Sequence, residues 1–331
     1  MTGSSVAEFD VRRYEPTDEA VVLELLGSSL GWHPDALHAR LFAWKHHESP
    51  FGASPAWVAT VADRVVGFRT FMRWEFLVDG RVVTAVRAVD TATHPDHRGQ
   101  GVFAGLTRHA LDVVRDDGVA FVFNTPNERS RPGYLAMGWQ PVRRLAVLAR
   151  PGSLRALGRI ARARTAADKW SVPSTVGVPA VEAFTDAGAV AALLETRPES
   201  GPRAGLRTNR SAAYLTWRYG FEPLGYRALT IDGPGGGLAV FRLRRRGPAV
   251  EAAVCEELVP GGDAKATRRL LGQVVKATGA DYAVRLGHHL PRARFVPLVG
   301  RGPILVCRDL GLMAIPEPGQ WHLGLGDVEL F

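Results

Sequence analysis

The stretch Asp90-Thr-Ala-Thr-His-Pro-Asp-His-Arg-Gly-Gln-Gly-Val-Phe-Ala-Gly-Leu106 decides the fold of the first half of the chain. It runs from an apolar strand, through a loop of small residues, into a segment whose apolar residues follow helical spacing. Gly99 and Gly101 have no Cβ, so the backbone there can approach a bulky anion closely. The first turn of the helix that follows offers unpaired N–H groups and the positive end of the helix dipole. The stretch therefore predicts a site for a phosphate or diphosphate group.

Outward from this stretch, the first half is typical of a mixed α/β domain in the order β-α-α-β-β-β-α-β-α-β. Ala62-Asp63 and Val78-Asp79-Gly80 lie between strand-like segments as tight turns, which predicts an antiparallel meander. Periodicity predicts strands over 9–14, 56–61, 65–77, 82–93 and 119–124, and helices over 20–26, 32–47, 103–114 and a short stretch before Met137-Gly138.

The chain has 331 residues, which is too long for one ordinary domain and fits two of about 150 each. We expect a first domain over 1–150, a basic, alanine-rich helical linker over 151–178, and a second domain over 179–331. The second half repeats the order of elements loosely, so the pattern indicates a duplicated fold of the α/β (α+β) class. Its predicted helices are 186–194, 209–219 and 264–276, and its predicted strands are 226–231, 237–244, 249–259, 282–286 and 304–309.

The loop resembles the acyl-CoA-binding motif of the GNAT family of N-acyltransferases, Gln/Arg-x-x-Gly-x-Gly/Ala. Arg98 stands at its first position and Gly101 at its fourth, whereas Phe103 departs from the small residue at the sixth. The stretches Tyr214–Tyr219 and Trp321–Asp327 resemble features of two-domain GNAT proteins. Together these resemblances imply two GNAT-like domains, each a mixed, mostly antiparallel sheet flanked by helices. The loop motif also implies that the strand before the loop splays from its neighbour and binds the pantetheine arm. The donor-binding residues it implies are Thr91, Ala92, Thr93, Arg98, Gly99, Gln100, Gly101, Val102, Phe103, Ala104 and Asn127.

A second segment, Asn127-Glu-Arg-Ser-Arg-Pro-Gly-Tyr134-Leu-Ala-Met-Gly-Trp139, resembles the second signature of the same family. The resemblance implies that Asn127 contacts the donor and that Tyr134 lies near the thioester sulfur. The departing thiolate needs a proton or a hydrogen-bond donor there, which a tyrosine can supply. Pro132 and Gly133 are expected to interrupt the helix that carries these residues. Together the two signatures extend the resemblance over about residues 9–148.

The residues leave the general base open. An amine acceptor arrives mostly as ammonium and must lose a proton before it attacks the thioester. Asp90 lies just ahead of the donor segment and is our first candidate, acting directly or through water, with His94 and Glu75 as alternatives. Resemblance to tandem acetyltransferases adds the terminal carboxylate of Phe331, although the last residues are also consistent with a docked strand. A chain of water molecules is a further possibility.

The second half has no counterpart of the donor loop. Its corresponding junction, Leu258-Val-Pro-Gly-Gly-Asp-Ala264, lacks the Arg-x-x-Gly pattern. We therefore interpret this half as a degenerate GNAT-like domain that completes the acceptor cleft or the core, with Trp217 and Tyr219 in the core. By fold analogy alone, the helices near Trp32 and Trp44 and the loop 46–49 line the acceptor pocket.

These features lead to the hypothesis of a tandem GNAT enzyme. It would transfer an acyl group, acetyl in the simplest case, from acyl-CoA to the amine of a small-molecule or peptide acceptor by direct attack. One alternative is an aminoacyl-tRNA-dependent transferase of the FemABX kind, which also pairs two GNAT-like domains. Another is a non-catalytic acyl-CoA-binding protein. The sequence predicts neither the acceptor, nor the acyl chain length, nor the oligomeric state.

Composition and charge limit the class of protein. A chain with 46% hydrophobic and 22% charged residues is typical of a globular protein. Its longest apolar runs fall far below the ~18 residues of a membrane span, and its first residues lack an export signal, so we expect a cytoplasmic protein without a membrane partner. Cys255, Cys307 and the pair His288-His289 have no partners at ligand spacing, which predicts no metal site. Residues 1–150 contain 17 basic and 17 acidic side chains, so the net charge of +8 lies in 151–331. We interpret this excess as a solvated surface and expect no nucleic-acid partner.

Overall fold

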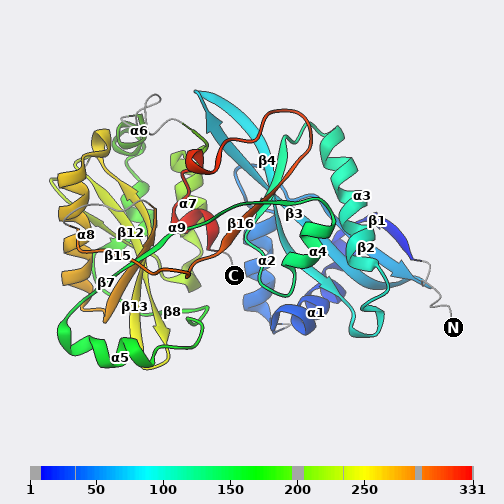
Figure 1. Ribbon diagram of the computed structural model, residues 1–331, viewed down its shortest axis with the longest axis horizontal. Helices are drawn as coiled ribbons and strands as arrows, with labels where there is room; N and C mark the ends of the chain where they lie inside the picture. Colours follow the sequence, from blue (N-terminus) through cyan, green and yellow to red (C-terminus); the bar gives the residue numbers. More distant parts are fainter. Residues whose placement is uncertain (1–8, 34, 196–204, 234, 288–292, 330–331) are drawn as a thin grey trace. The chain divides into compact units, whose positions relative to one another are not determined.

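The computed structural model describes residues 9–33, 35–195, 205–233, 235–287 and 293–329. It contains two sheets, both mostly antiparallel and flanked by helices, which confirms the predicted fold class (Figure 1). The chain divides into two compact units that alternate along the sequence. The first gathers Met1–Phe76, Val82–Arg143 and Leu305–Ile315, and the second gathers Leu77–Arg81, Arg144–Ile304 and Pro316–Phe331. No helix of the described residues is long and apolar enough to cross a membrane.

The first sheet has the strand order β1-β2-β3-β4-β5-β16-β6. The predicted meander is confirmed, since β2 pairs with β3 antiparallel and Val61 lies opposite Arg64 across a two-residue turn. Ala62 and Asp63 both have positive φ, the conformation that a tight hairpin turn requires. The strands are β1 (Asp10–Arg13), β2 (Ala56–Val61), β3 (Arg64–Val78), β4 (Arg81–Thr93), β5 (Phe121–Asn124), β6 (Gln140–Arg144) and β16 (Ile304–Asp309), and the helices are α1 (Glu19–Leu30), α2 (Ala36–His46), α3 (Val102–Asp116) and α4 (Arg131–Ala136).

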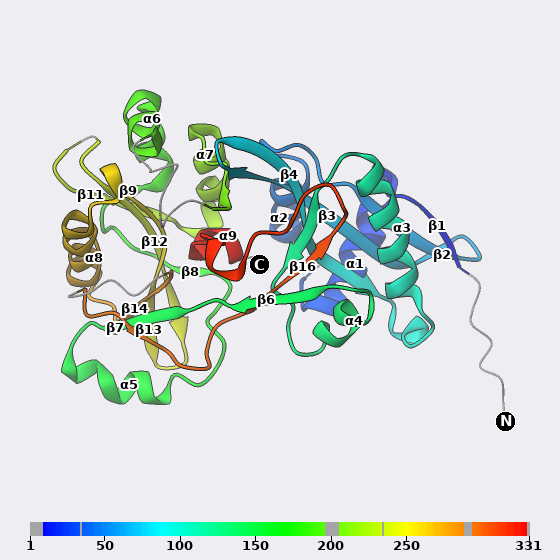
Figure 2. The same ribbon diagram turned by 45° about the horizontal axis from the view of Figure 1, so that its top comes forward.

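Helices cover both faces of this sheet (Figure 2). On one face the ring of Phe68 in β3 lies 6.0 Å from the ring of Phe42 in α2. The preceding residue, Gly67, points to the opposite face because side chains alternate along a strand. A Cβ on Gly67 would lie 2.6 Å from Val102 Cγ1 and 2.9 Å from Leu106 Cδ1, both in α3. The helix α3 therefore packs directly on the backbone of β3, and this contact fixes where its first turn lies.

Strand β16 comes from the far end of the sequence, yet it lies within the first sheet between β5 and β6. It pairs antiparallel with β5, with Val306 opposite Asn124 and Asp309 opposite Phe121. Its Arg308 donates from Nη1 to the carbonyl oxygen of Gly138 at 3.1 Å. The segment just after α4 is thus held by a residue 170 positions away.

The second sheet repeats the arrangement of the first. Strand β13 pairs with β14 in parallel, as β4 pairs with β5, and α8 connects them as α3 connects β4 to β5. The apolar side of α8, including Leu270 and Val274, packs against Phe241 and Val254 of the sheet. The order is β15-β7-β14-β13-β12-β11-β9, with β8 against β12. Its strands are β7 (Val147–Pro151), β8 (Ser171–Val172), β9 (Val178–Pro179), β11 (Arg227–Thr230), β12 (Leu238–Arg246), β13 (Ala249–Leu258), β14 (Tyr282–Leu286) and β15 (Val296–Pro297), and the helices are α5 (Leu157–Arg162), α6 (Ala187–Glu195), α7 (Ala212–Gly220), α8 (Ala264–Thr278) and α9 (Leu325–Val328). The two-residue strand β10 (Arg207–Thr208) is not part of this sheet.

The segment 151–178 contains less helix than predicted. Only α5 (Leu157–Arg162) is α-helical there, and it is six residues long. Beyond it the backbone N–H of Asp168 donates to the carbonyl oxygen of Arg245 at 2.8 Å, and Ser171–Val172 pairs with β12. Pairing with the sheet therefore outweighs the helix propensity of the alanine-rich sequence.

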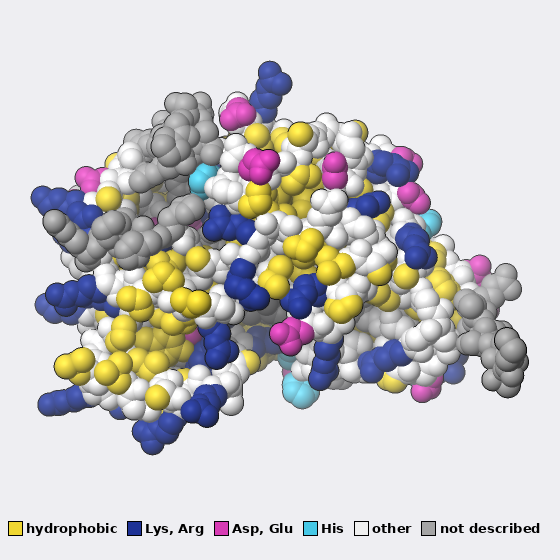
Figure 3. Space-filling view, viewed as in Figure 1, with side chains coloured by type: hydrophobic (Ala, Val, Ile, Leu, Met, Phe, Trp, Pro, Cys, Tyr) yellow, Lys and Arg dark blue, Asp and Glu magenta, His cyan; other side chains and the backbone are white. Residues whose placement is uncertain are grey.

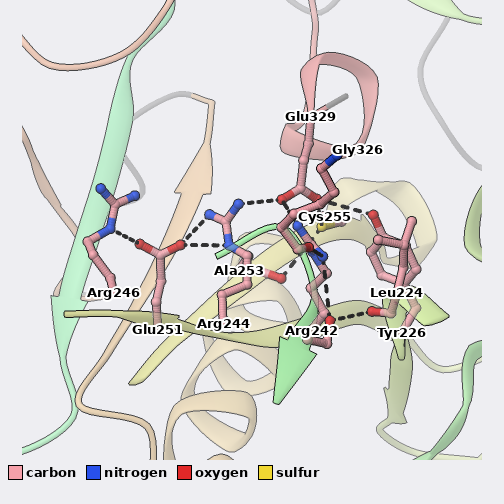
Figure 4. Close-up of polar contacts among 12 residues, drawn as sticks. Leu224, Tyr226, Arg242, Arg244, Arg246, Glu251, Ala253, Cys255, Gly326 and Glu329 are labelled. Carbon is pink, nitrogen blue, oxygen red and sulfur yellow. Dashed lines mark hydrogen bonds and ion pairs between the residues drawn. The ribbon is translucent and has the colours of Figure 1, made fainter. Parts of the chain in front are cut away.

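On the side of the second sheet away from α8, a buried group of charges holds the end of the described chain (Figure 4). The Glu329 carboxylate accepts hydrogen bonds from Arg242 Nη2 at 2.7 Å and Arg244 Nη1 at 2.6 Å. Tyr226 Oη donates to the same carboxylate at 3.1 Å. Arg218 donates to the backbone carbonyl oxygens of Gly326 and Glu329, both at 2.9 Å. We call Arg218, Tyr226, Arg242, Arg244 and Glu329 the Glu329 cluster.

Candidate active site

The strand β4 separates from its parallel neighbour partway along its length. Its pairing with β5 ends at Arg87 and Phe123, although β4 continues to Thr93. Over the described residues, 88–93 thus extend beyond the ladder with β5. Asp90 has φ 42°, a strained value for a non-glycine residue, and it interrupts the regular strand at this point. The geometry agrees with the splayed strand that the resemblance implies for Thr91, Ala92 and Thr93.

The first turn of α3 is open. Gly99 and Gly101 have φ of 76° and 83°, and a Cβ added to either would meet no atom within 4 Å. Gly101 is the N-cap residue and has no side chain to satisfy the helix amides. The first intrahelical bond runs from Gly105 N to Gly101 O at 2.9 Å, so the amides of residues 102–104 have no acceptor within the helix. These groups fit a phosphate or diphosphate.

The side chains around this loop brace it. Gln100 Nε2 donates to the carbonyl oxygen of Asp96 at 3.0 Å, and Arg98 Nε donates to that of Thr93 at 3.3 Å. Both contacts tie the loop to the segment that joins it to β4. The predicted residues of the donor loop therefore form one continuous turn.

The corresponding helix terminus in the second unit is already filled. The N-cap residue of α8 is Asp263, and its carboxylate accepts hydrogen bonds from Lys265 N at 2.5 Å and Ala266 N at 3.1 Å. A negative charge at this position repels a phosphate and uses the amides that would bind it. Of the two related helices, α3 alone has an uncapped first turn.

Tyr134 lies in α4 (Arg131–Ala136), and the prediction that Pro132 and Gly133 interrupt this helix is wrong. Pro132 lies in the first turn, where a backbone N–H has no acceptor within the helix, so a proline costs no hydrogen bond there. The Tyr134 side chain is buried, with its ring 5.5 Å from Phe103 and 5.1 Å from Trp139. Phe103 also lies against Gly133, where an added Cβ would be 3.0 Å from its ring. The large residue at the sixth motif position thus packs against the tyrosine.

Asn127 has a local contact in this structure. Its Oδ1 accepts hydrogen bonds from Arg129 N at 3.0 Å and Ser130 N at 2.9 Å. This turn leads into α4 and so helps to place Tyr134. The contact between Asn127 and a donor stays a prediction.

The Asp90 carboxylate is buried against two cationic or basic side chains of α2. Its Oδ2 lies 2.5 Å from Lys45 Nζ and 2.9 Å from His46 Nε2. Burial alone raises the pKa of Asp90, but the charge of Lys45 and the hydrogen bond from His46 outweigh it and lower this pKa to about 2. Asp90 therefore remains a carboxylate at any physiological pH, with little tendency to take a proton itself.

His46 connects Asp90 to a hydroxyl group. Its Nδ1 lies 3.1 Å from Ser54 Oγ, while its Nε2 faces Asp90. Burial lowers the pKa of His46, and the neighbouring Asp90 carboxylate opposes this shift in part. With the proton on Nε2, the neutral ring accepts the Ser54 hydroxyl proton at Nδ1. Ser54 is half-buried, so this row of three groups runs from the buried carboxylate to a partly accessible oxygen.

The remaining candidates for the base lie on other elements. His94 Nδ1 is 3.4 Å from the backbone N of Asp96, on the loop after β4, and Glu75 lies on β3. The terminal residue Phe331 and the pair His288-His289 lie outside the described residues. Among the residues that are described, no three His, Cys, Asp or Glu side chains gather as a metal site would require.

Basic side chains on the face shown in Figure 3 lie singly or in small groups, with apolar and acidic side chains between them. A nucleic-acid-binding surface usually presents a continuous basic stripe or patch. The described basic residues on this face do not form one continuous patch of this kind.

Residues 10–142 match the family model of the acetyltransferase (GNAT) domain. Residues 10–142 are therefore a GNAT acetyltransferase domain, as the two signatures predicted. No curated protein matches the chain in sequence.

Solved structures share the fold over nearly the whole chain. A probable N-acyltransferase from Enterococcus faecalis is 12% identical with a TM-score of 0.64, covering 92% of this chain and 73% of that chain. A GCN5-related N-acetyltransferase from Anabaena variabilis is 12% identical with a TM-score of 0.64, covering 92% and 74%. Another from Kribbella flavida is 15% identical with a TM-score of 0.60, covering 92% and 72%. At these identities the likeness concerns the fold, and it extends over both sheets.

Proposed function

We propose that the protein is an acyl-CoA-dependent N-acyltransferase that transfers an acyl group to the amine of a small-molecule or peptide acceptor by direct attack. The observation that carries this proposal is the uncapped first turn of α3 beside the separated end of β4. The names of the neighbouring structures, two of which are N-acetyltransferases, favour acetyl as the group transferred.

In this proposal the donor lies along one continuous surface of the first unit. Residues 91–93 bind its pantetheine arm through their backbone, and residues 99–104 bind its diphosphate through amides and the helix dipole. Asn127 adds a contact from the turn before α4. Tyr134 donates a proton to the thiolate that leaves when the carbon–sulfur bond breaks. The second unit, with Asp263 closing its helix terminus, serves as a degenerate GNAT-like domain.

We further propose that the attacking amine loses a proton through Ser54 and His46. The acceptor attacks as the free amine, after its ammonium form has lost one proton to water. Its nitrogen bonds to the acyl carbon and gives up a second proton to Ser54 Oγ, while the Ser54 hydroxyl proton passes to His46 Nδ1. The imidazolium that results lies against the Asp90 carboxylate, which stabilises it at 2.9 Å. We call Ser54, His46 and Asp90 the relay. In it His46 is the base, and Asp90 is the fixed anion.

Acetyl-CoA binding tests the donor site. Gly101→Asp is expected to weaken binding by about 100-fold or more, because it strains a positive-φ position and places a carboxylate where the diphosphate would lie. Each charge-assisted hydrogen bond lost there costs about 1.5–3 kcal/mol. Calorimetric titration of acetyl-CoA into wild type and variant measures the effect.

Gly118→Asp is the matched control. Gly118 also has positive φ, 80°, and open space around an added Cβ, but it lies at the other end of α3. It should cost similar stability and leave the affinity near that of wild type. Equal affinities in the two variants would remove the loop from the donor site.

The relay makes a prediction about pH. His46→Gln is expected to lower kcat about 100-fold, at the low end of what general-base catalysis contributes. In wild type the rate should rise with pH through a pKa below 6.5, since His46 must be neutral to accept a proton and burial lowers its pKa. That limb should disappear from the pH profile of kcat/KM in the variant, measured with an amine acceptor found by mass-spectrometric screening.

The exposed His109 of α3, in the same unit, provides the control. His109→Gln should keep the rate and the acidic limb. A His46→Gln enzyme with the pH profile of wild type would exclude the relay.

A further inference from the structure

The strand β3 carries a guanidinium group into the middle of the donor region. Arg69 is wholly buried, and its Cζ lies 4.5 Å from the ring centroid of Phe71 and 5.4 Å from that of Tyr134. Phe103 of α3 lies on the same group, with its ring centroid 5.9 Å away. Three aromatic rings therefore surround a permanent positive charge.

The hydrogen bonds of Arg69 fix the role of Tyr134. Arg69 Nη1 donates to Tyr134 Oη at 2.8 Å and also to Thr91 Oγ1. A guanidinium has donors and no acceptor, so the tyrosine oxygen must be the acceptor of this bond. The hydroxyl proton of Tyr134 is then directed to some other atom. Arg69 thus sets Tyr134 as a proton donor and joins it to Thr91, in the strand that would bind the pantetheine arm.

The positive charge of Arg69 has no counter-ion among the described residues. Its Nε and Nη2 are buried and lack a hydrogen-bond partner there, and no carboxylate of those residues forms an ion pair with it. Asp90, which precedes Thr91 on the neighbouring strand β4, is engaged by Lys45 and His46. Arg242, an equally buried arginine of the second unit, is instead paired with Glu329 at 2.7 Å. Burying a cation without an anion lowers the stability of the fold. Arg69 is therefore better explained by a role in function than by a role in folding.

We propose that Arg69 is the positioning residue that stabilises the negative charge of the departing thiolate, acting through Tyr134. This rests on the proposed function. When the carbon–sulfur bond breaks, the electron pair stays on sulfur and Tyr134 supplies its proton. The phenolate that remains lies 2.8 Å from Arg69 Nη1 and later regains a proton from solvent. A site built in this way binds coenzyme A more tightly as the thiolate than as the thiol.

The thiol of bound coenzyme A gives a test that needs no acceptor. The affinity of coenzyme A is measured between pH 6.5 and 9.5 and divided at each pH by that of desulfo-coenzyme A, which lacks the titrating group. An opposite charge within about 4–6 Å lowers a pKa by one unit or more. The wild-type ratio should therefore rise about fivefold or more over this range. In Arg69→Met the ratio should stay flat, and in Arg69→Lys, which keeps the charge, most of the rise should return.

Thermal unfolding separates this role from a structural one. Because the charge has no counter-ion in the described fold, Arg69→Met should be as stable as wild type or more stable. Arg73→Met is the control on the same strand, since Arg73 bonds to the carbonyl oxygen of Ala53, and it should keep the pH-dependent ratio.

Three results would overturn the inference: an equal rise in Arg69→Met and wild type, a flat ratio in wild type that binds both ligands, or failure of Arg69→Met to fold. The last would show that the guanidinium is needed for packing. A wild-type protein that binds neither ligand would instead contradict the proposed function.

Discussion

Tyr134→Phe is expected to lower kcat about 1000-fold and to change KM little. Loss of a general acid typically costs 10²–10⁴ in rate, and 1000-fold corresponds to about 4 kcal/mol in the activation free energy. The ring contacts with Phe103 and Trp139 stay in the phenylalanine variant, so donor binding is preserved. Steady-state kinetics with acetyl-CoA and a screened amine measure the effect.

A donor with a better leaving group tests whether Tyr134→Phe loses activity because it lacks the general acid. A thioester whose thiol has a lower pKa needs less help from an acid, so the variant should recover activity with such a donor. Tyr14→Phe is the matched control, because Tyr14 lies in the same unit and packs on Phe42 and Phe68. It should keep the rate of wild type. If Tyr134→Phe kept full activity, Tyr134 would not be the general acid, and only its contribution to donor binding would remain.

Glu329→Gln is expected to destabilise the second unit by about 3–5 kcal/mol. The substitution keeps the shape of the side chain but leaves Arg242 and Arg244 buried without their anion, and breaking a buried pair costs this much. Chemical denaturation followed by fluorescence measures the difference in the free energy of unfolding. Glu182→Gln, at an exposed carboxylate of the same unit, should change it by less than about 0.5 kcal/mol.

The effect of this substitution should depend on pH. Burial raises the pKa of Glu329, but Arg242 and Arg244 outweigh it and lower this pKa from 4.5 to about 2. Because the folded pKa is the lower one, the carboxylate contributes its full stability above about pH 4.5 and loses it as the pH falls toward 2. Wild type and Glu329→Gln should therefore converge in stability over this range. A difference that stays constant down to pH 2 would contradict the role of the charge.

Much of the fold was predictable because the elements carry local signals. The turn at Ala62-Asp63 and the apolar periodicity of α3 are encoded in neighbouring residues, and both are confirmed. The strand over 304–309 was also predicted, but its place between β5 and β6 was not. A strand pattern states which residues alternate and says nothing about which distant strand it will pair with. For the same reason the pairing of Ser171–Val172 with β12, which shortens the linker helix, left no signal in the sequence.

The candidate site was predictable where a motif exists and obscure where it depends on packing. The two signatures led to Gly101 and Tyr134, and Asp90 was singled out by its position before the loop. Its partner Lys45 is 45 residues earlier in a different element, and no spacing rule connects the two. Arg69 was equally hidden, since an arginine within an apolar strand is usually a residue of the exposed face. A charged residue flanked by aromatic ones in a central strand is the signal that would have found it.

The position of β16 has a consequence for biosynthesis. The GNAT sheet is completed by a strand encoded near residue 305, so a nascent chain that has emerged only as far as residue 150 lacks one of its inner strands. Domains generally fold as units in the order of their synthesis, but this one must wait for the second to be translated. Until then the free edge of β5 is an exposed pairing surface, and a ribosome stalled in the second half would display it to chaperones.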